Sequence, residues 1–569
     1  MSIQTKPAPR PPQPTPAEVE RDARTLAPPS GPNMLAGGII LTLLAIAVWS
    51  VWSLGISPQA ILNSIDNARD FFSRMWPLDF PPIGELWQMT ALTLAIVVCA
   101  TLLAVILSTV VAVFAAHTTS PGPRAQGIAR VIIVVCRALP ELVLVVIFVR
   151  IFGFGTIAGI LAMGLHSVGM VGKMYADAIE DADDGPRRAL EAAGATRLQQ
   201  VMGATLPGIL PAMIATGLHR FDINLRVSVI LGWVGVSGIG QSLQHALSTQ
   251  NYQRGMALAV VILALCITVE LISGAIRAKL LGRDRARKDR RLAGVKPSSR
   301  APEPPVTDRR ISPPWTGERV ARHAYLLLTA LIVLLSIWYA DVNWGRFFEG
   351  FVKIPDVAGQ FLPPSPGTMS WSTIWAQLGI TLQIAFAATL LGALMALPVG
   401  FLAARNVAPN LQVAQFFRMV IVVVRGIPEL ILAIVFVVIS GMGPIAGTFA
   451  LAIGAMGLLS KLVADSIEET DIRVQEALRA NGASRVQVFF GATIRQAMPA
   501  IVAHVIYQLD VNFRSATLLG IVGAGGIGFY IENARRVLQF EVITLILVLV
   551  IAIVLILEGI AILLRKIVR

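Results

Sequence analysis

Residues 222–240 read DINLRVSVILGWVGVSGIG, and residues 510–528 read DVNFRSATLLGIVGAGGIG. Aligned without gaps at a shift of 288 residues, the two stretches are identical at ten of nineteen positions. The identities include Asp, Asn and Arg as well as glycines, so chance similarity between two apolar runs does not explain them. A repeat of this length predicts two copies of one structural unit, which decides the fold.

The same shift relates other polar motifs of the chain. Residues 137–144 (RALPELVL) recur as residues 425–432 (RGIPELIL), and residues 173–179 (KMYADAI) recur as residues 461–467 (KLVADSI). Arg, Pro, Glu, Lys and Asp all stay in register over the whole distance. The chain is therefore a tandem duplication.

The composition indicates that both copies lie in a membrane. Of the 569 residues, 55% are hydrophobic and 14% are charged, whereas soluble domains carry about 25% charged residues. Apolar runs long enough to span a bilayer recur along the chain. We predict an all-α, polytopic transmembrane helical bundle of about twelve transmembrane helices, six in each half. They lie near residues 35–54, 90–116, 130–150, 155–175, 208–231 and 256–278, and near 324–340, 377–403, 418–440, 444–463, 497–520 and 542–564.

Charge and proline content predict how the two copies are joined. Residues 277–322 contain fourteen Lys and Arg against five acids. Such a segment could bind nucleic acid, but the positive-inside rule explains it as a cytoplasmic loop with no nucleic-acid partner. We therefore expect both termini in the cytoplasm of a prokaryote, with both modules in the same orientation and a pore between them. The predicted parts are a disordered tail (1–33), a first module (34–281), a basic linker (282–322) and a second module (323–569).

Cysteine and histidine usage gives no sign of a metal site or a disulfide framework. The three cysteines, at positions 99, 136 and 266, lie in apolar runs, and the six histidines show no ligand spacing. A membrane enzyme acting on lipid phosphates would need a nucleophile, an acid–base pair or a metal cluster. We therefore predict no metal, no catalytic residue and no enzymatic activity in this chain.

A polar stretch between the fourth and fifth apolar segments also occurs twice. It reads RALEAAG at residues 188–194 and EALRANG at residues 476–482. Residues that favour helix are followed by a glycine that favours a helix stop, which predicts a short cytoplasmic helix, a turn and a second helix.

This stretch resembles the cytoplasmic EAA loop of ABC-importer permeases, and the chain is similar to the phosphonate-type members over residues 85–280 and 373–568. The resemblance implies the type I importer permease fold, duplicated in tandem, with coupling helices that bind an ATPase. The residues that match the coupling loops are Ala189, Leu190, Glu191, Gly194, Glu476, Ala477 and Gly482. Arg188 stands where the family pattern has Glu, which predicts two unequal coupling contacts.

Ionisable residues also occur at membrane depth, where each charge costs at least about 2.5–3.5 kcal/mol. Pairs four residues apart would lie on one helix face with opposite signs and neutralise each other. The alternative is a polar lining of the translocation path, in which Arg226 and Arg514 are best suited to face an oxyanion. The candidates are Arg137, Glu141, Asp222, Arg226, Arg425, Glu429, Asp510 and Arg514.

A glycine-rich motif follows each of the fifth segments. No soluble βαβ unit surrounds it, so it is not a dinucleotide fingerprint. Glycines at such positions allow close helix packing, or they form a gate or substrate site, and both readings stay open. The residues are Gly235, Gly238, Gly240, Gly523, Gly526 and Gly528.

The resemblance implies a permease subunit that moves a phosphonate, phosphate or phosphite oxyanion across the cytoplasmic membrane. No phosphate-binding GxxxxGK[ST] loop occurs in the sequence, so we expect no cofactor in this chain and ATP–Mg on a separate ATPase. The expected partners are two copies of that ATPase, an external substrate-binding protein and the lipid bilayer. A secondary transporter with parallel repeats and an ABC permease for another small solute are the alternatives.

Overall fold

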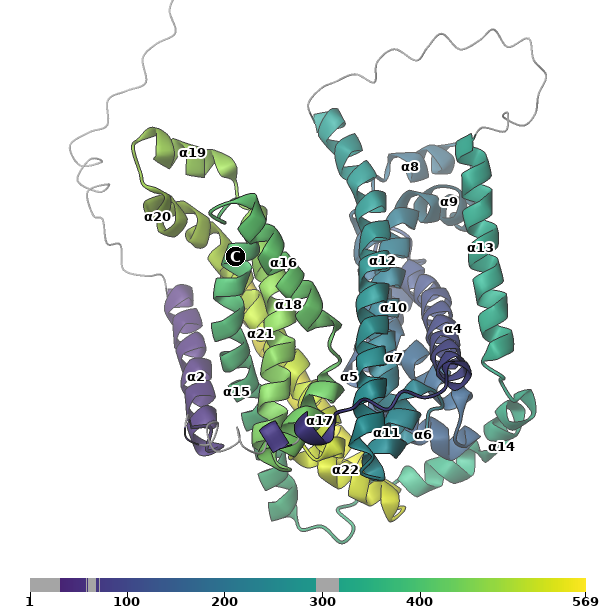
Figure 1. Cartoon of the computed structure of the whole chain (residues 1–569). Helices are drawn as coiled ribbons and strands as arrows, with labels where there is room; N and C mark the ends of the chain where they lie inside the picture. The colour runs from purple at the N-terminus through teal and green to yellow at the C-terminus, as the bar shows by residue number, and fades with distance from the viewer. Residues whose placement is uncertain (1–30, 58, 60–67, 71, 293–316, 569) are drawn as a thin grey trace, which may run out of the picture.

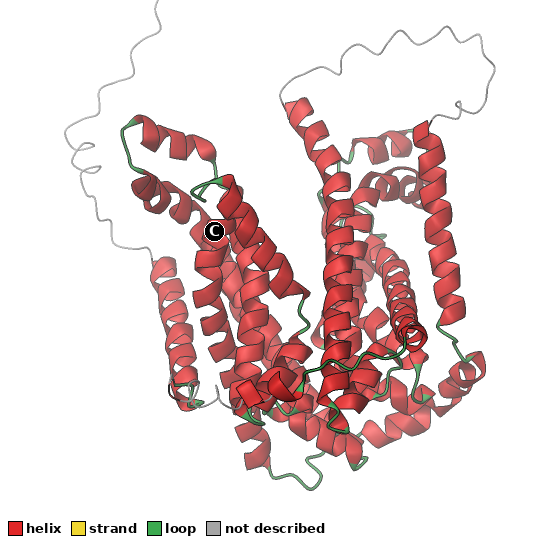
Figure 2. Cartoon of the chain, viewed as in Figure 1, coloured by secondary structure: helices red, strands yellow, loops and turns green. Residues whose placement is uncertain are grey.

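The computed structural model describes residues 31–57, 59, 68–70, 72–292 and 317–568. In this part of the chain every regular element is a helix, as Figure 2 shows. The all-α prediction is confirmed. Residues 1–30 of the predicted disordered tail (1–33) and most of the predicted linker lie outside the described residues, while residues 31–33 are helical and begin the first helix.

The first module contains ten labelled helices among the described residues. They are α2 (Gly31–Ser53), α4 (Ile83–Ala115), α5 (Pro123–Ala138), α6 (Glu141–Phe152), α7 (Thr156–Glu180), α8 (Gly185–Ala192), α9 (Arg197–Gln200), α10 (Leu206–Leu231), α11 (Ile239–Ser248) and α12 (Tyr252–Leu292).

The second module repeats this order and has α14 after its first span; at the repeat positions of α14 the first module is described only in part, and residues 59, 68–70 and 72–74 are helical there. The helices of the second module are α13 (Gly317–Tyr339), α14 (Trp344–Phe361), α15 (Trp371–Ala403), α16 (Leu411–Gly426), α17 (Glu429–Ser440), α18 (Pro444–Glu468), α19 (Ile472–Ala480), α20 (Arg485–Val488), α21 (Ile494–Leu519), α22 (Ile527–Arg536) and α23 (Phe540–Val568). Helices α12 and α13 extend into the predicted linker from both sides.

Nine helices of the described chain are long and apolar enough to cross a membrane, and twelve spans result if each of three bent helix pairs crosses as one. The bent pairs are α5 with α6, α13 with α14, and α16 with α17. The predicted number of about twelve therefore includes three interrupted spans.

Prolines break the third span of each module. Helix α5 meets α6 at an angle of 91°, and α16 meets α17 at 79°. In both cases the residue before the proline is extended, and the proline itself precedes the first residue of the next helix. Proline lacks an N–H and disfavours the helical conformation of the residue before it, so the break follows from the X-Pro dipeptide.

The first helix of each module packs against the other module. Helix α2 lies along α15, and α13 lies along α4, at opposite edges of the bundle in Figure 1. The two modules that follow one another in the sequence therefore exchange a helix in space. The set of helices that pack together as one bundle therefore differs from the set that follow one another in the sequence.

Small residues bring the central helices of each module close together. Ala100, Ala104 and Ala112 on α4 are fully buried. On α15, Gly392 and Gly400 stand at the repeat positions of Ala104 and Ala112. A Cβ added at either glycine would come within 3.0 Å of α18 atoms. In lipid, where apolar burial alone does not drive association, close backbone approach of this kind stabilises helix pairs.

Candidate functional site

Both modules place the predicted helix–turn–helix at the same end of the bundle. Helix α8 is followed by α9 and a π-helical turn (Val201–Thr205) that leads into α10, and α19 is followed by α20, a π-helical turn (Phe489–Thr493) and α21. Figure 1 shows both sets at the end where α12 finishes and α13 begins. The predicted short helix, turn and second helix are confirmed.

Gly194 and Gly482 form the turns. Their φ angles are +82° and +83°, a left-handed conformation in which a side chain is strained. In each turn the N–H of the following alanine donates to the carbonyl five residues earlier, at 3.0 and 3.1 Å. A capping box then starts the next helix. Glycine is needed here for backbone conformation, since nothing lies within 4 Å of an added Cβ.

The residues that match the coupling loops lie on the outside of these helices. Ala189, Glu191, Glu476 and Ala477 are exposed, and Leu190 is half-buried. Their side chains are therefore available to a partner.

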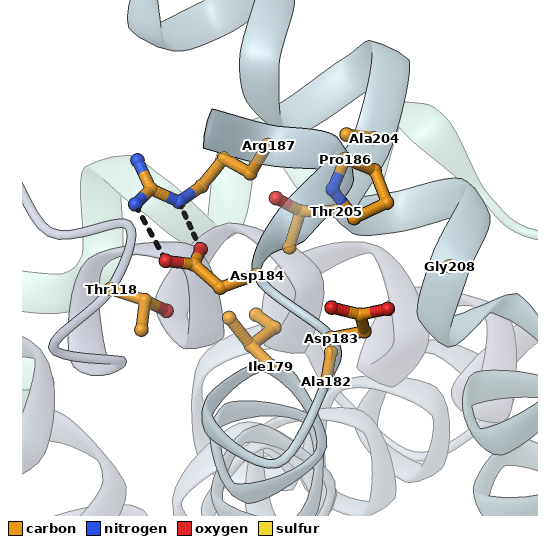
Figure 3. Close-up of a pocket in the computed structure, with 10 residues that line it drawn as sticks. All are labelled: Thr118, Ile179, Ala182, Asp183, Asp184, Pro186, Arg187, Ala204, Thr205 and Gly208. Atoms are coloured by element: carbon orange, nitrogen blue, oxygen red, sulfur yellow. Dashed lines mark hydrogen bonds and ion pairs between the residues drawn. The ribbon is translucent and has the colours of Figure 1, made fainter. Parts of the chain in front are cut away.

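A charged network fixes α8 to the segments around it. Arg187 forms an ion pair with Asp184, with Nε and Oδ1 2.5 Å apart, and its Nη1 donates to Glu191 and to Gln200, each at 3.2 Å. Hydrogen bonds from Arg187 and Arg188 hold the pKa of Asp184 far below its usual range. Figure 3 shows the Arg187–Asp184 pair beside a pocket of roughly 180 Å³, which is lined by Thr118, Ile179, Ala182, Asp183, Asp184, Pro186, Arg187, Ala204, Thr205 and Gly208.

Helix α19 is held by mainly neutral hydrogen bonds. Gln475, which occupies the repeat position of Arg187, is 2% exposed and donates from Nε2 to Thr470 Oγ1 at 2.9 Å. Asp471 caps the helix by accepting from the N–H of Arg473 at 2.9 Å, which lowers the pKa of Asp471. The two coupling-type helices thus differ in how they are attached as well as at positions 188 and 476.

Five charged residues meet where α10 and α12 of the first module contact α16 of the second. We call this group the Glu270 cluster: Asp222, Arg226, Glu270, Arg277 and Arg425. Glu270 lies 3.2 Å from Arg425 Nη1 and 3.3 Å from Arg226 Nη2, and Arg277 lies 2.7 Å from Asp222. Three arginines face two carboxylates, which leaves one positive charge in excess.

A corresponding group lies between α21 and α23 of the second module and α5 of the first. This Glu558 cluster consists of Arg137, Asp510, Arg514 and Glu558. Arg137 Nη2 lies 2.5 Å from Glu558 Oε1, and Arg514 forms an ion pair with Asp510. Glu558 is the repeat counterpart of Glu270, so the two clusters are related by the duplication.

Two arginines also bind the main chain of the opposite module. Arg226 Nη1 donates to the carbonyl of Arg425 at 2.8 Å, and Arg514 Nη1 donates to the carbonyl of Arg137 at 3.1 Å. Each carbonyl is available because the helix ends there, before the proline. The broken third span therefore supplies the acceptor through which the modules are joined.

The predicted pairing of charges four residues apart holds in one case. Asp510 pairs with Arg514 as predicted. Asp222 and Arg226 share α10, but the Asp222 carboxylate pairs with Arg277. The predicted pairs of Arg137 with Glu141 and of Arg425 with Glu429 are wrong, because the proline break turns the second residue of each pair onto a new helix axis.

Sequence reasoning missed the acids that join the modules, Glu270 and Glu558. Both stand in the last apolar span of a module, 288 residues apart. The repeat shift that identified the other charges would therefore have found them too.

Glu141 belongs to a separate buried group inside the first module, the Arg220 group: Glu141, His166 and Arg220. Glu141 Oε1 lies 2.6 Å from Arg220 Nη2 and 3.0 Å from His166 Nε2. Arg220 is 4% exposed and also donates from Nε to Ser167 Oγ at 2.6 Å. In the second module Glu429 is hydrogen-bonded to Ser515.

The candidate glycines form a tight turn between α10 and α11, and again between α21 and α22. Gly235 and Gly523 end a 3₁₀ turn with φ angles of +100° and +90°. Gly238 and Gly526 also have positive φ, and the next N–H donates to Thr93 or Thr381 Oγ1 at 2.9 Å. An added Cβ on Gly240 or Gly528 would lie 2.6 or 2.0 Å from a backbone carbonyl oxygen. Gly240 and Gly528 therefore allow close backbone packing at the turn, and the other four glycines have φ angles that disfavour a side chain.

Comparison with known proteins matches this architecture to a family of membrane transport components. A family model described as "Binding-protein-dependent transport system inner membrane component" matches residues 108–282 and 396–569. One matched range lies in each half of the duplication, and the two ranges begin 288 residues apart.

Individual relatives match either one module or both. The phosphate-import permease protein PhnE of Mycolicibacterium smegmatis is 38% identical over 512 residues, which cover 90% of this chain and 91% of the relative. The phosphite transport system permease protein PtxC of Stutzerimonas stutzeri is 37% identical over 241 residues, which cover 42% of this chain and 88% of the relative. The match to the first relative therefore extends over both modules, and the match to the second has the length of one.

Proposed function

The chain belongs to the family of binding-protein-dependent transport system inner membrane components, and from this premise we propose that it is the permease of an ABC importer for tetrahedral phosphorus oxyanions. The substrates are phosphate, phosphonates or phosphite. One observation carries the proposal: two coupling-type helices lie at one end of a bundle whose two modules are joined by arginine-rich clusters.

The substrate class rests on charge as well as on the relatives, whose names refer to phosphate and phosphite. The Glu270 cluster contains one more arginine than carboxylates, and guanidinium groups present forked donors to phosphate-like oxygens. A net positive charge at the junction of the modules favours an anion in a medium where unpaired charge is costly. The pathway residues of our proposal are Arg137, Glu141, Asp222, Arg226, Arg425, Glu429, Asp510 and Arg514.

The energy source is a separate ATPase that carries ATP–Mg. Two copies of the ATPase would bind this chain, one at α8 and one at α19, because the exposed faces of both helices are free for a partner. A substrate-binding protein would deliver the oxyanion at the opposite end of the bundle. In this arrangement both chain termini lie on the cytoplasmic side of the inner membrane, with the coupling-type helices.

Reconstituted uptake tests the proposal. The chain is expressed with a candidate ATPase and a candidate binding protein, and uptake of ³²P-phosphate into vesicles is measured with and without ATP, with phosphonate, phosphite, sulfate and methionine as competitors. We expect ATP-dependent uptake that phosphorus oxyanions inhibit more strongly than sulfate or methionine. Uptake that persists without the ATPase would instead identify a secondary transporter, and competition by an unrelated solute alone would identify another ABC substrate.

A further inference from the structure

The Arg220 group occurs in the first module alone. At the repeat positions of the second module, Glu429 corresponds to Glu141, but Gly454 replaces His166 and Gln508 replaces Arg220. Nearby links are conserved between the modules, since Asn224 donates to Thr101 and Asn512 donates to Thr389 at about the same distance, 3.0 and 2.9 Å. The second module therefore shows that this part of the fold forms without the Arg and the His.

His166 lies on the other side of the Glu141 carboxylate from Arg220. His166 Nδ1 lies 2.9 Å from the carbonyl of Leu139, and its Nε2 lies 3.0 Å from Glu141 Oε1. A carbonyl can only accept, so Nδ1 carries a proton. Glu141 Oε1 therefore lies between His166 and Arg220.

The guanidinium of Arg220 keeps donors that no strong acceptor uses. Its Nε binds Ser167 and one Nη2 donor binds Glu141, but the described contact of Nη1 is the sulfur of Met170 at 3.8 Å. A thioether is a weak acceptor, and a buried charged donor without an oxygen partner is costly. Arg220 is 4% exposed, so it is a buried cation with N–H donors available to an anion.

The group also lies beside the contact between the modules. Glu141 is the first residue of α6, directly after the break at which Arg514 of the second module binds the Arg137 carbonyl. Arg514 interacts electrostatically with both Glu141 and His166. On the transport path that we propose along this contact, an anion comes close to the Arg220 group.

We propose that Arg220 is an oxyanion-binding residue of the first module, and that Glu141 occupies its place for the anion in the present conformation. This inference rests on the proposed transport of phosphorus oxyanions. When the oxyanion binds the fork of Arg220, Glu141 moves away and keeps His166 as its partner, so that no buried carboxylate is left unpaired. The second module has Gln508 in place of Arg220, so the anion binds at this depth to the first module and not to the second.

Opposite effects of two substitutions test the proposal. Binding of ³²P-orthophosphate is measured on the full chain in lipid nanodiscs, without binding protein or ATPase. Arg220→Gln, which gives the first module the residue of the second, is expected to weaken binding by about tenfold or more, as for the loss of a charged hydrogen bond. Glu141→Gln removes the competing carboxylate and is expected to tighten binding by about tenfold.

Control variants separate this role from a structural one. If Glu141 and Arg220 form only a stabilising pair, both variants weaken binding and assembly together, and that result overturns the proposal, as does unchanged binding in both. The double variant Glu141→Gln/Arg220→Gln removes both charges and is expected to assemble but to bind phosphate weakly. Gln508→Leu, at the same depth in the second module, is expected to change binding less than about twofold.

The uptake assay distinguishes this inference from the proposed function. If wild-type vesicles transport phosphorus oxyanions but Arg220→Gln and Glu141→Gln change phosphate binding in the same direction, the Arg220 inference alone is wrong. If wild-type vesicles transport none of these oxyanions, the proposed function is wrong.

Discussion

Arg425 of the second module lies 3.2 Å from Glu270 of the first, and the two side chains are only 6% and 8% exposed. The repeat counterpart of this pair, Arg137 with Glu558, is 26% and 23% exposed. The duplication thus supplies one deeply buried and one more accessible ion pair at equivalent places between the same two modules.

Glu270→Ala is expected to destabilise the assembled chain more than Glu558→Ala. Glu270 faces three arginines, so its removal leaves buried positive charge unpaired, at a cost of about 3–5 kcal/mol. Glu558 forms an ion pair with one arginine and is more accessible, so its removal leaves less buried charge unpaired and is expected to cost less. Thermal unfolding of the purified variants in nanodiscs measures the difference, and equal losses would contradict the assignment of Glu270 as the main anchor.

The turn at Gly482 offers a test of coupling. Gly482→Asp adds a negative charge to an exposed turn that we propose to face the ATPase, and we expect uptake per ATP hydrolysed to fall about tenfold while membrane insertion stays normal. Gly482→Asn is the matched control, because Asn tolerates the left-handed φ of +83° without adding charge. If the Asn variant is impaired as strongly as the Asp variant, backbone strain and not charge explains the defect.

Helix α8 is expected to respond to acid only at low pH. The pKa of Asp184 in the folded chain lies below its unfolded value, so its contribution to stability is fully present above the unfolded pKa of about 4 and is lost as the pH falls below it. Protection factors for amide hydrogen exchange over residues 185–194, in which the intrinsic pH dependence of exchange is divided out, are therefore expected to be the same at pH 7 and pH 5. Arg187→Ala is expected to lower these protection factors at both pH values, and unchanged protection would show that the network does not hold the helix.

The sequence predicted the repeat, the helix class and the helix–turn–helix because each is written locally. Apolar runs, a glycine after a helix-favouring stretch and each of the motifs that recur after 288 residues lie within short windows of sequence. The breaks in the third spans were also readable, since Pro140 and Pro428 each follow a residue that X-Pro geometry keeps extended. The segments on both sides of each proline are mainly apolar, so the hydropathy of those spans suggested one continuous helix.

The contacts between helices were less predictable. Glu141, His166 and Arg220 come from α6, α7 and α10, and nothing in the local sequence places three such residues together. Sequence spacing paired Glu141 with Arg137, but the structure gives each a distant partner. Charges in a membrane must be paired, but the sequence alone does not show which residue is the partner of each charge.

The exchanged first helices predict how the chain tolerates being cut. A cut between residues 304 and 305 gives two fragments, each of which carries the helix that covers the other, since α2 packs on α15 and α13 packs on α4. Co-expressed fragments are therefore expected to assemble and to transport, while either fragment alone exposes the surface left by the missing helix. Co-purification through a tag on one fragment, followed by the uptake assay, measures this. Removing α2 from the first fragment is the control, and we expect it to weaken assembly with the second fragment. Unchanged assembly would show that the exchange contributes little and that the Glu270 and Glu558 clusters hold the modules together without it.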